Sequence, residues 1–248
     1  MKGRRRIFPS REEFEVKAAQ GIASLLLGAI REEGSASLVL SGGATPAGVY
    51  RQLGSAPVGG RIDWSKVHLF WGDERCVPPS SPESNFRLVN ESLLKQIAIP
   101  GGNVHRIRAE RPPADAAHEY EGEIRGALAL EGDQLPRFAI VLLGLGTDGH
   151  TASLFPATAG LTERGRLVTE VFVPQYEAWR ITMTLPVINN AGHILFLVSG
   201  EGKAEILRKV IGEESSELPA QQVAPRSGLV EWYVDRDAAS LLTKGIPQ

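Results

Sequence analysis

The segment ASLVLSGGATPAGVY, residues 36–50, decides the fold. It begins with a short apolar run typical of a buried strand, and its end predicts a helix with Thr45 as cap and a proline in the first turn. Between them, Gly42 and Gly43 allow a tight turn with exposed backbone N–H groups. A strand that leads into a helix in this way predicts an anion site at the helix N-terminus. A plain turn is the alternative, and the added Ser41 and Thr45 favour the anion site.

Similar apolar runs alternate with helical periodicity along the rest of the chain. Buried strands are predicted at 36–41, 67–72, 138–143 and 193–199, and edge strands at 168–173, 180–185 and 230–234. Helices are predicted at 10–33, 45–53, 84–96, 113–129, 201–211 and 236–243. This alternation predicts an α/β fold with a single doubly wound, mainly parallel sheet and helices on both faces. We expect one domain over residues 1–248, with ligands bound beyond the carboxyl ends of the strands.

Composition excludes several functional classes. The 248 residues are 42% hydrophobic and carry a formal net charge of -2, so no global field favours nucleic acid or a membrane surface. The apolar runs are too short for a membrane helix, and no apolar stretch follows the basic start as in a signal peptide. The single cysteine, Cys76, excludes an internal disulfide and suits a reducing compartment. We expect a cytoplasmic protein and a monomer.

Three charged residues follow the strand predicted at 67–72. These are Asp73, Glu74 and Arg75. A run of charges is usually a solvated loop, but a position directly after a buried strand favours a site. A carboxylate can orient a guanidinium, and arginine can stabilise a developing oxyanion. The next helix begins near Asn85, which either caps that helix or also faces the substrate.

The segment VLLGLGTDGHTASLFP, residues 141–156, is the most specific motif. It contains the pattern G-x-G-x-x-G, which suggests a dinucleotide site. That site needs a helix of normal length, and Pro156 predicts a break after barely two turns. The glycines are better interpreted as a loop that presents Asp148 and His150. A lone histidine is usually structural, but this one lies at a strand end with an acid two residues away, which favours proton transfer.

Two cations complete the candidate residues. Arg180 lies in a predicted edge strand, and Lys203 follows a buried strand and a glycine turn. A surface lysine needs no special explanation, and the segment is no Walker loop, because Leu197 and Ala204 replace the residues which that pattern requires. As further contacts for a phosphate held at residues 41–46, the two cations are well suited.

Absent patterns narrow the chemistry further. The chain has no G-x-S-x-G elbow for a serine nucleophile and no H-E-x-x-H, and its five histidines are scattered without zinc-ligand spacing. We therefore expect no metal site. Cys76 beside Arg75 could be an activated thiolate, but a small packing residue is the better interpretation.

Taken together, these motifs resemble the 6-phosphogluconolactonases of the oxidative pentose phosphate pathway. The resemblance rests on SGGATP, GDERCVPP with SNF, GLGTDGHTASLFP, RITMTLPVINNA, SGEGKAEIL, LPAQQV and LVEWYVDRDAA, which span residues 41–239. It implies hydrolysis of 6-phospho-D-glucono-1,5-lactone to 6-phospho-D-gluconate without a cofactor. It also implies a small-molecule phosphosugar lactone as the partner.

The resemblance further implies a role for each candidate residue. His150 is the general base on a water, with Asp148 orienting it. Arg75 stabilises the oxyanion, and Asp73 fixes Arg75. The remaining residues bind substrate: Ser41, Gly42, Gly43, Thr45, Arg180 and Lys203 hold the phosphate, and Asn85 contacts sugar hydroxyls.

Three rival functions remain open at this stage. A glucosamine-6-phosphate deaminase would share the fold, the phosphate loop and a comparable lysine. A sugar-phosphate-binding regulatory module would keep the phosphate loop but would not need His150 together with Arg75. A dinucleotide-binding oxidoreductase would use the glycine pattern.

Overall fold

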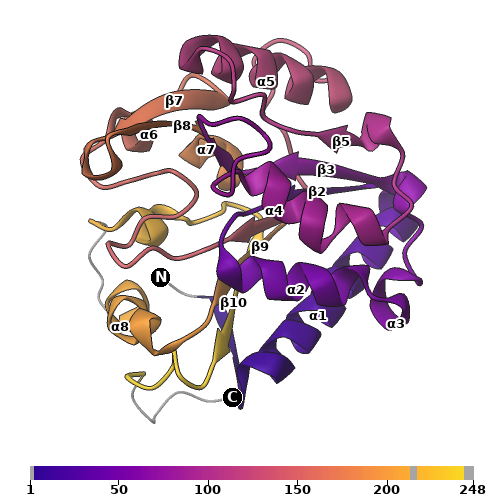
Figure 1. Ribbon diagram of the computed structural model, residues 1–248, viewed down its shortest axis with the longest axis vertical. Helices are drawn as coiled ribbons and strands as arrows, with labels where there is room; N and C mark the ends of the chain where they lie inside the picture. Colours follow the sequence, from indigo (N-terminus) through magenta and orange to yellow (C-terminus); the bar gives the residue numbers. More distant parts are fainter. Residues whose placement is uncertain (1–2, 213–216, 243–248) are drawn as a thin grey trace.

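The computed structural model, which describes residues 3–212 and 217–242, is built on a seven-stranded sheet in which every neighbouring pair is parallel (Figure 1). The strand order is β1-β10-β9-β6-β2-β3-β5. The strands are β1 (Arg4–Phe8), β2 (Ala36–Leu40), β3 (Val67–Trp71), β5 (Val104–His105), β6 (Ile140–Leu143), β9 (His193–Val198) and β10 (Leu229–Asp235). The prediction of a mainly parallel α/β sheet is confirmed.

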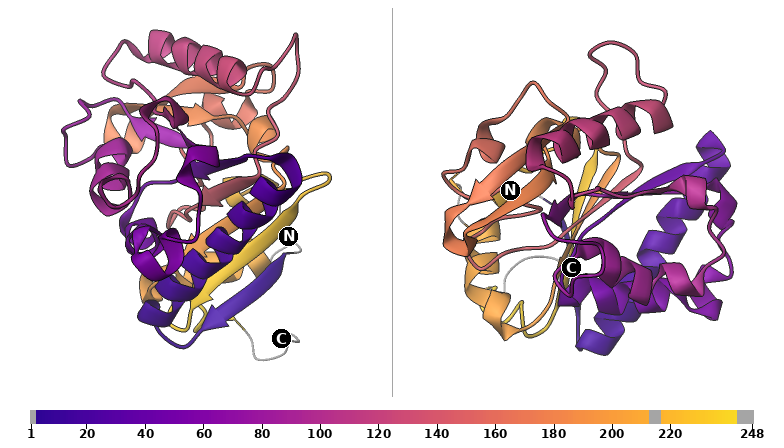
Figure 2. Two further views of the ribbon diagram at one scale, coloured as in Figure 1. Left: turned by 90° about the vertical axis from the view of Figure 1, so that its right-hand side faces the viewer. Right: turned by 45° about the horizontal axis from the view of Figure 1, so that its top comes forward.

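Helices cover both faces of this sheet (Figures 1 and 2). On one face lie α1 (Arg11–Glu33), α2 (Ala44–Gly54) and α4 (Asn85–Ser92). On the other lie α5 (Pro113–Ala127) and α8 (Ala204–Gly212). After β2 the chain adds β3 and β5 on one side of β2, and it then returns to add β6 on the other side. The order of the strands therefore reverses between β2 and β6. Such a switch point is where open α/β sheets bind ligands.

Helix α1 shows how local sequence sets an element. Ser10 caps it by accepting the backbone N–H of Glu13 at 3.2 Å, and Gly34 ends it with φ +82°. The side chains at helical spacing are buried against the sheet: Phe14, Ala18, Ile22 and Leu26. The helix predicted at 10–33 is therefore confirmed.

A second, three-stranded antiparallel sheet was not predicted. It has the order β4-β8-β7, with β4 at Asp73–Arg75, β8 at Ala178–Met183 and β7 at Val168–Val173. Two of the three predicted edge strands, 168–173 and 180–185, therefore pair with each other rather than with the main sheet. The third, 230–234, is not at an edge, because β10 pairs with β1 on one side and β9 on the other. The charged residues after β3 form strand β4. Gly72 joins the sheets, because its N–H bonds to Leu40 while its carbonyl accepts the N–H of Met183.

Several helix predictions need correction. Helix α2 begins at Ala44 with Gly43 as N-cap, so Thr45 is not the cap. The helix predicted at 84–96 ends at Ser92, and residues 94–96 form a 3-10 turn. The helix predicted at 201–211 begins as a 3-10 turn at 201–203. Residues 236–242 form turns rather than the predicted helix, and residue 243 lies outside the described part.

The remaining elements are short. Single-turn helices are α3 (Ala56–Gly59), α6 (Ala159–Thr162) and α7 (Leu185–Ile188). Strands β1 and β5 were not predicted, because β1 begins with three arginines and β5 has two residues. Along 3–212 and 217–242, no helix combines the length and apolar character that crossing a membrane requires.

Candidate active site

The predicted site residues meet at the switch point between β2 and β6. A cavity of about 240 Å³ opens there, beyond the carboxyl ends of the strands. Among its lining residues are Ser41, Gly42, Gly43, Asp73, Arg75, Asn85, His150, Tyr176, Arg180 and Lys203. Two predicted site residues are not in the lining: Thr45, in the first turn of α2, and Asp148, which contacts His150.

The turn between β2 and α2 lines this cavity with Ser41, Gly42 and Gly43. Gly43 has φ +105°, which favours glycine, and a Cβ on Gly42 would lie 1.8 Å from Oδ1 of Asn85. The Tyr50 hydroxyl fixes the turn by bonding both the N–H and the carbonyl of Ser41, at 2.9 and 2.8 Å. No side chain caps α2, so its N-terminus remains available to an anion.

Strand β4 turns its residues alternately toward and away from the cavity. Asp73 and Arg75 line it, while Glu74 points away and is 3% exposed. The Glu74 carboxylate accepts the N–H groups of Asn85 and Phe86, at 2.7 and 2.8 Å. Burial raises the pKa of Glu74, although these hydrogen bonds oppose the shift. Glu74 thereby ties the start of α4 to β4, a contribution that the sequence prediction missed.

The expected contact between Asp73 and Arg75 is not formed in the described part of the chain. Asp73 accepts the Ser153 hydroxyl at 2.7 Å and the Asn85 amide at 3.3 Å. Arg75 donates from Nη1 to the carbonyl of Glu83 at 2.5 Å. Residues two apart on a strand project in parallel about 7 Å apart, which explains why the two side chains find different partners. Asp73 therefore fixes Asn85 rather than Arg75.

Two arginines are neighbours on adjacent strands of the second sheet. Arg75 on β4 is in register with Arg180 on β8, and both line the cavity. In the part of the chain that the structure describes, the Nε atoms of both are buried without a hydrogen-bond partner. Burial, together with the charge of Arg75, lowers the pKa of Arg180, while the ring of Tyr176 lies 5.1 Å from its guanidinium carbon. Like charges placed opposite each other are unfavourable, so this pair is suited to an anion.

His150 is held in place by a carboxylate and an aromatic ring. Its Nδ1 lies 2.5 Å from Oδ1 of Asp148, and its ring packs on Phe155 with centroids 4.1 Å apart. The Asp148 carboxylate also accepts the amide of Gln175 at 3.2 Å. Burial lowers the pKa of His150, with Asp148 opposing the shift, so the neutral ring prevails at pH 7. With Nδ1–H donated to Asp148, Nε2 is left to accept a proton.

The loop around His150 lacks the helix that a dinucleotide-binding glycine pattern requires. Residues 144–158 contain turns and an isolated bridge but no helix, so the expected helix broken at Pro156 does not form. The glycines shape the loop instead. A Cβ on Gly146 would lie 2.1 Å from Nδ1 of His150, and Gly149 has φ +81°.

Lys203 reaches the cavity from the opposite side of the switch point. It ends a 3-10 turn at Glu201–Lys203 that follows β9. Burial lowers the pKa of Lys203, and the charge of Asp148 opposes that shift.

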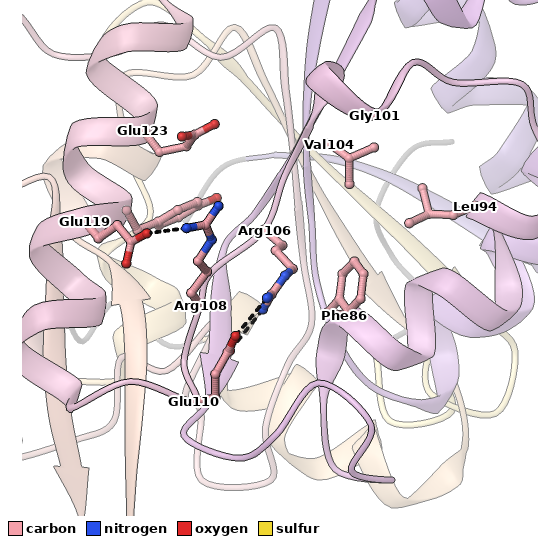
Figure 3. Close-up of a pocket in the computed structure, with 10 residues that line it drawn as sticks. Phe86, Leu94, Gly101, Val104, Arg106, Arg108, Glu110, Glu119 and Glu123 are labelled. Carbon is pink, nitrogen blue, oxygen red and sulfur yellow. Dashed lines mark hydrogen bonds and ion pairs between the residues drawn. The ribbon is translucent and has the colours of Figure 1, made fainter.

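A larger cavity, of about 660 Å³, lies beside α5 and is lined by Arg106, Arg108, Glu110 and Glu119 among others (Figure 3). The arginine side chains that line this cavity are paired with its glutamates. Arg106 donates to both carboxylate oxygens of Glu110, at 3.0 and 2.8 Å, and Arg108 donates to Glu119 at 2.8 Å. An anion would have to break these pairs, whereas the smaller cavity offers cations whose Nε atoms are unpaired.

Other candidate chemistries find less support. Burial raises the pKa of Cys76 to about 11, so its thiol is neutral at pH 7 and packs against the core. Among residues 3–212 and 217–242, no three His, Cys, Asp or Glu side chains are grouped closely enough to hold a metal ion.

Several residues around the site were not proposed as site residues from the sequence. Ser153 and Glu74 hold Asp73 and Asn85, while Gln175 and Tyr176 come from the turn between β7 and β8. That turn does not follow a strand of the main sheet. The expectation that site residues lie at the carboxyl ends of the parallel strands therefore could not indicate it. The proximity of Arg180 in the sequence was the one available indication.

Comparisons with known proteins find relatives over most of this chain. A family model described as glucosamine-6-phosphate isomerases/6-phosphogluconolactonase matches residues 9–232. A 6-phosphogluconolactonase of Aggregatibacter actinomycetemcomitans is 38% identical over 84% of this chain and 88% of its own length. One of Rattus norvegicus is 36% identical over 96% of this chain and 93% of its own. The crystal structure of a 6-phosphogluconolactonase from Thermotoga maritima superposes with a TM-score of 0.81 at 30% identity, covering 94% of this chain and all of that one.

Proposed function

The chain belongs to the glucosamine-6-phosphate isomerase/6-phosphogluconolactonase family, and from this premise we propose that its site hydrolyses 6-phospho-D-glucono-1,5-lactone to 6-phospho-D-gluconate in the oxidative pentose phosphate pathway. The observation that carries the proposal is one cavity that combines an oriented base with unpaired cations. His150 is fixed by Asp148, while Arg75 and Arg180 each keep a buried Nε without a partner in the described residues. A regulatory module that only binds a phosphosugar has no need of the base.

The phosphate is anchored at the N-terminus of α2. Backbone N–H groups from Gly42 to Thr45 supply donors that no side chain caps. Arg180 and Lys203 add positive charge from the other side of the cavity. Holding the phosphate fixes the distant lactone carbonyl, and this positioning contributes to the rate.

Hydrolysis then proceeds in two steps. Water attacks the C1 carbonyl carbon while Nε2 of His150 takes its proton, and Arg75 stabilises the oxyanion of the tetrahedral intermediate. The intermediate collapses, the bond from C1 to the ring oxygen breaks, and His150 returns its proton to that oxygen. The product is an open-chain acid, and His150 is again neutral.

Asp148, Asp73 and Asn85 support these steps. Asp148 sets the tautomer of His150, and Gln175 orients Asp148. Asp73 holds the Asn85 amide nitrogen, which leaves Oδ1 of Asn85 buried and without a partner among the described residues. A sugar hydroxyl that donates to this oxygen would satisfy it.

The proposal is tested by generating the lactone in situ and following its loss with and without the protein. The lactone also hydrolyses spontaneously, so the enzyme must accelerate loss above that background. A folded protein that gives no acceleration would overturn the lactonase assignment. Ammonia released from glucosamine 6-phosphate would then identify a deaminase on the same fold.

Replacing Lys203 by alanine should raise KM for the phosphorylated lactone by about 10-fold or more, because a charge-assisted contact is worth about 1.5–3 kcal/mol. kcat should change little, since the phosphate is remote from the carbonyl. The measurement compares kinetics on 6-phosphogluconolactone and on unphosphorylated glucono-1,5-lactone. Equal losses on both substrates would argue against a phosphate contact.

The acid limb of the activity should lie below the ordinary pKa of histidine. The folded pKa of His150 lies below its ordinary value of 6.5, so the basic ring exists above that lowered pKa and is lost as pH falls through it. The acid limb of kcat should therefore have its midpoint below pH 6.5. The measurement should use saturating glucono-1,5-lactone, which carries no phosphate. A phosphate ester itself titrates at about pH 6 and would add its own limb to the profile.

Asp148→Asn provides the matched control for this profile. The Asp148 charge raises the pKa of His150, so its removal should move the remaining acid limb to lower pH and reduce kcat. An acid limb with its midpoint above 6.5 in the unaltered protein would contradict the assignment of this limb to His150.

A further inference from the structure

The segment LVEWYVDRDAA has no part in the mechanism above, yet Asp235 within it contacts the turn that leads to Lys203. Its Asp235 is the last residue of β10 and is 2% exposed. Because β10 runs parallel to β9 with Val234 opposite Val198, Asp235 lies next to Ser199, the first residue beyond β9. Asp235 is not among the residues that line the catalytic cavity.

The Asp235 carboxylate collects donors from two segments. It accepts the Ser199 hydroxyl at 2.5 Å and the Gly200 N–H at 3.0 and 3.1 Å. It also accepts the N–H of Ala238 at 2.9 Å, which closes the turn after β10. Hydrogen bonds to an ionised carboxylate are stronger than neutral ones, and several of them on one buried group hold it rigidly.

These bonds determine where Lys203 lies. Gly200 has φ +96°, a conformation that glycine favours, and its carbonyl accepts the N–H of Lys203 at 3.0 Å. The 3-10 turn that ends at Lys203 is therefore built directly on the peptide that Asp235 holds. A displaced Gly200 would move the Lys203 backbone with it.

We propose that Asp235 is a positioning residue that fixes the turn from Ser199 to Lys203, so that the lysine ammonium meets the substrate phosphate. The inference rests on the proposed function, since it deepens the role of Lys203 in the same site. A long, flexible lysine binds a phosphate tightly only when its backbone is already placed, because ordering it on binding reduces affinity.

The test is Asp235→Asn, with Asp237→Asn as the matched control. An asparagine in place of Asp235 would keep an acceptor but cannot accept all of these donors, whereas Asp237 is exposed and takes no part in these bonds. Asp235→Asn should raise KM for 6-phosphogluconolactone by about 10-fold with kcat within about twofold. Hydrolysis of glucono-1,5-lactone should be unchanged, and so should all kinetics of Asp237→Asn.

Two further variants test whether Asp235 acts through Lys203. Adding Asp235→Asn to Lys203→Ala should raise KM little further, because the two residues act through one contact. Ser199→Ala removes one donor and leaves the carboxylate, so a smaller rise in KM is expected even if Asp235→Asn does not fold. Equal losses on both lactones, or additive effects with Lys203→Ala, would overturn the inference.

Calorimetry with the product, 6-phosphogluconate, separates this inference from the proposed function. Asp235→Asn should weaken the Kd of the product by about 10-fold, whether or not turnover is observed. Turnover by the unaltered protein with an unchanged product Kd in Asp235→Asn would overturn the positioning role alone. Product binding that responds to Asp235→Asn, without any acceleration of lactone loss, would overturn the lactonase function alone.

Discussion

Replacing His150 by alanine should lower kcat for lactone hydrolysis by about 10²–10⁴-fold, which is the usual contribution of a positioned general base. KM should change by less than about twofold, because the proposed role places His150 at the attacking water rather than at the phosphate. The residual rate should exceed the spontaneous one, since Arg75 and the phosphate anchor remain. In situ generation of the lactone, with the spontaneous rate subtracted, gives both constants.

His118→Ala is the matched control for this experiment. His118 is an exposed histidine on α5, so its removal tests for a general effect of losing an imidazole. His118→Ala should retain full activity. His150→Gln keeps a hydrogen-bonding side chain but no base, and it should lose as much kcat as the alanine variant. An unchanged kcat in folded His150→Ala would remove His150 from the chemistry.

Replacing Arg75 by alanine should lower kcat by about 10²–10³-fold, the cost of losing one donor to a developing oxyanion. The Arg75 guanidinium is already fixed by the carbonyl of Glu83, so it needs little reorganisation during the reaction. Arg75→Lys should recover part of the rate, because an ammonium retains the charge without the planar donors. Steady-state kinetics on both lactones should show the loss of kcat.

Arg180→Ala and Arg87→Ala separate the possible roles of Arg75. Arg180 lies opposite Arg75, and its removal should mainly raise KM for the phosphorylated lactone. Arg87 on α4 pairs with Glu91 at an exposed position, so its removal should leave the kinetics unchanged. If Arg75→Ala raised KM and left kcat intact, Arg75 would be a phosphate ligand and the oxyanion role would be wrong.

The main sheet could be predicted because its central strands are continuous apolar runs between turn residues. Helix α1 was equally accessible, since both its cap at Ser10 and its stop at Gly34 are local signals. The sequence predicted a helix that begins after the glycine turn, but it predicted the wrong N-cap residue for α2. Gly43 takes the cap position because its φ of +105° suits glycine, whereas Thr45 falls in the first turn.

The second sheet could not be predicted from local sequence patterns. β4 is three charged residues long, and its partner β8 lies more than a hundred residues further along the chain. Nothing in the sequence next to β4 specifies that pairing. The contact between Asp73 and Arg75 that the resemblance implied is not formed in the described residues, because side chains two apart on a strand project in parallel and find different partners.

Most of the site could nevertheless be predicted, because the carboxyl ends of parallel strands meet at one edge of the sheet. This rule identified Ser41, Asp73 and His150 from their positions after predicted strands. It could not identify Gln175 or Tyr176, which come from the hairpin turn of the second sheet. Their place depends on how the two sheets pack, a relation between distant segments.

The pairing of β1 with β10 has a consequence for how the molecule is made. β1 is formed by residues 4–8, but its parallel partner is residues 229–235. During synthesis the first strand therefore emerges long before its neighbour, and the edge of the sheet closes only after more than two hundred residues have followed. Such long-range parallel pairing is intrinsically slow. Because Asp235 belongs to that last strand, a nascent chain still lacking it would already contain His150 and Arg75, while the turn that carries Lys203 would not yet be held.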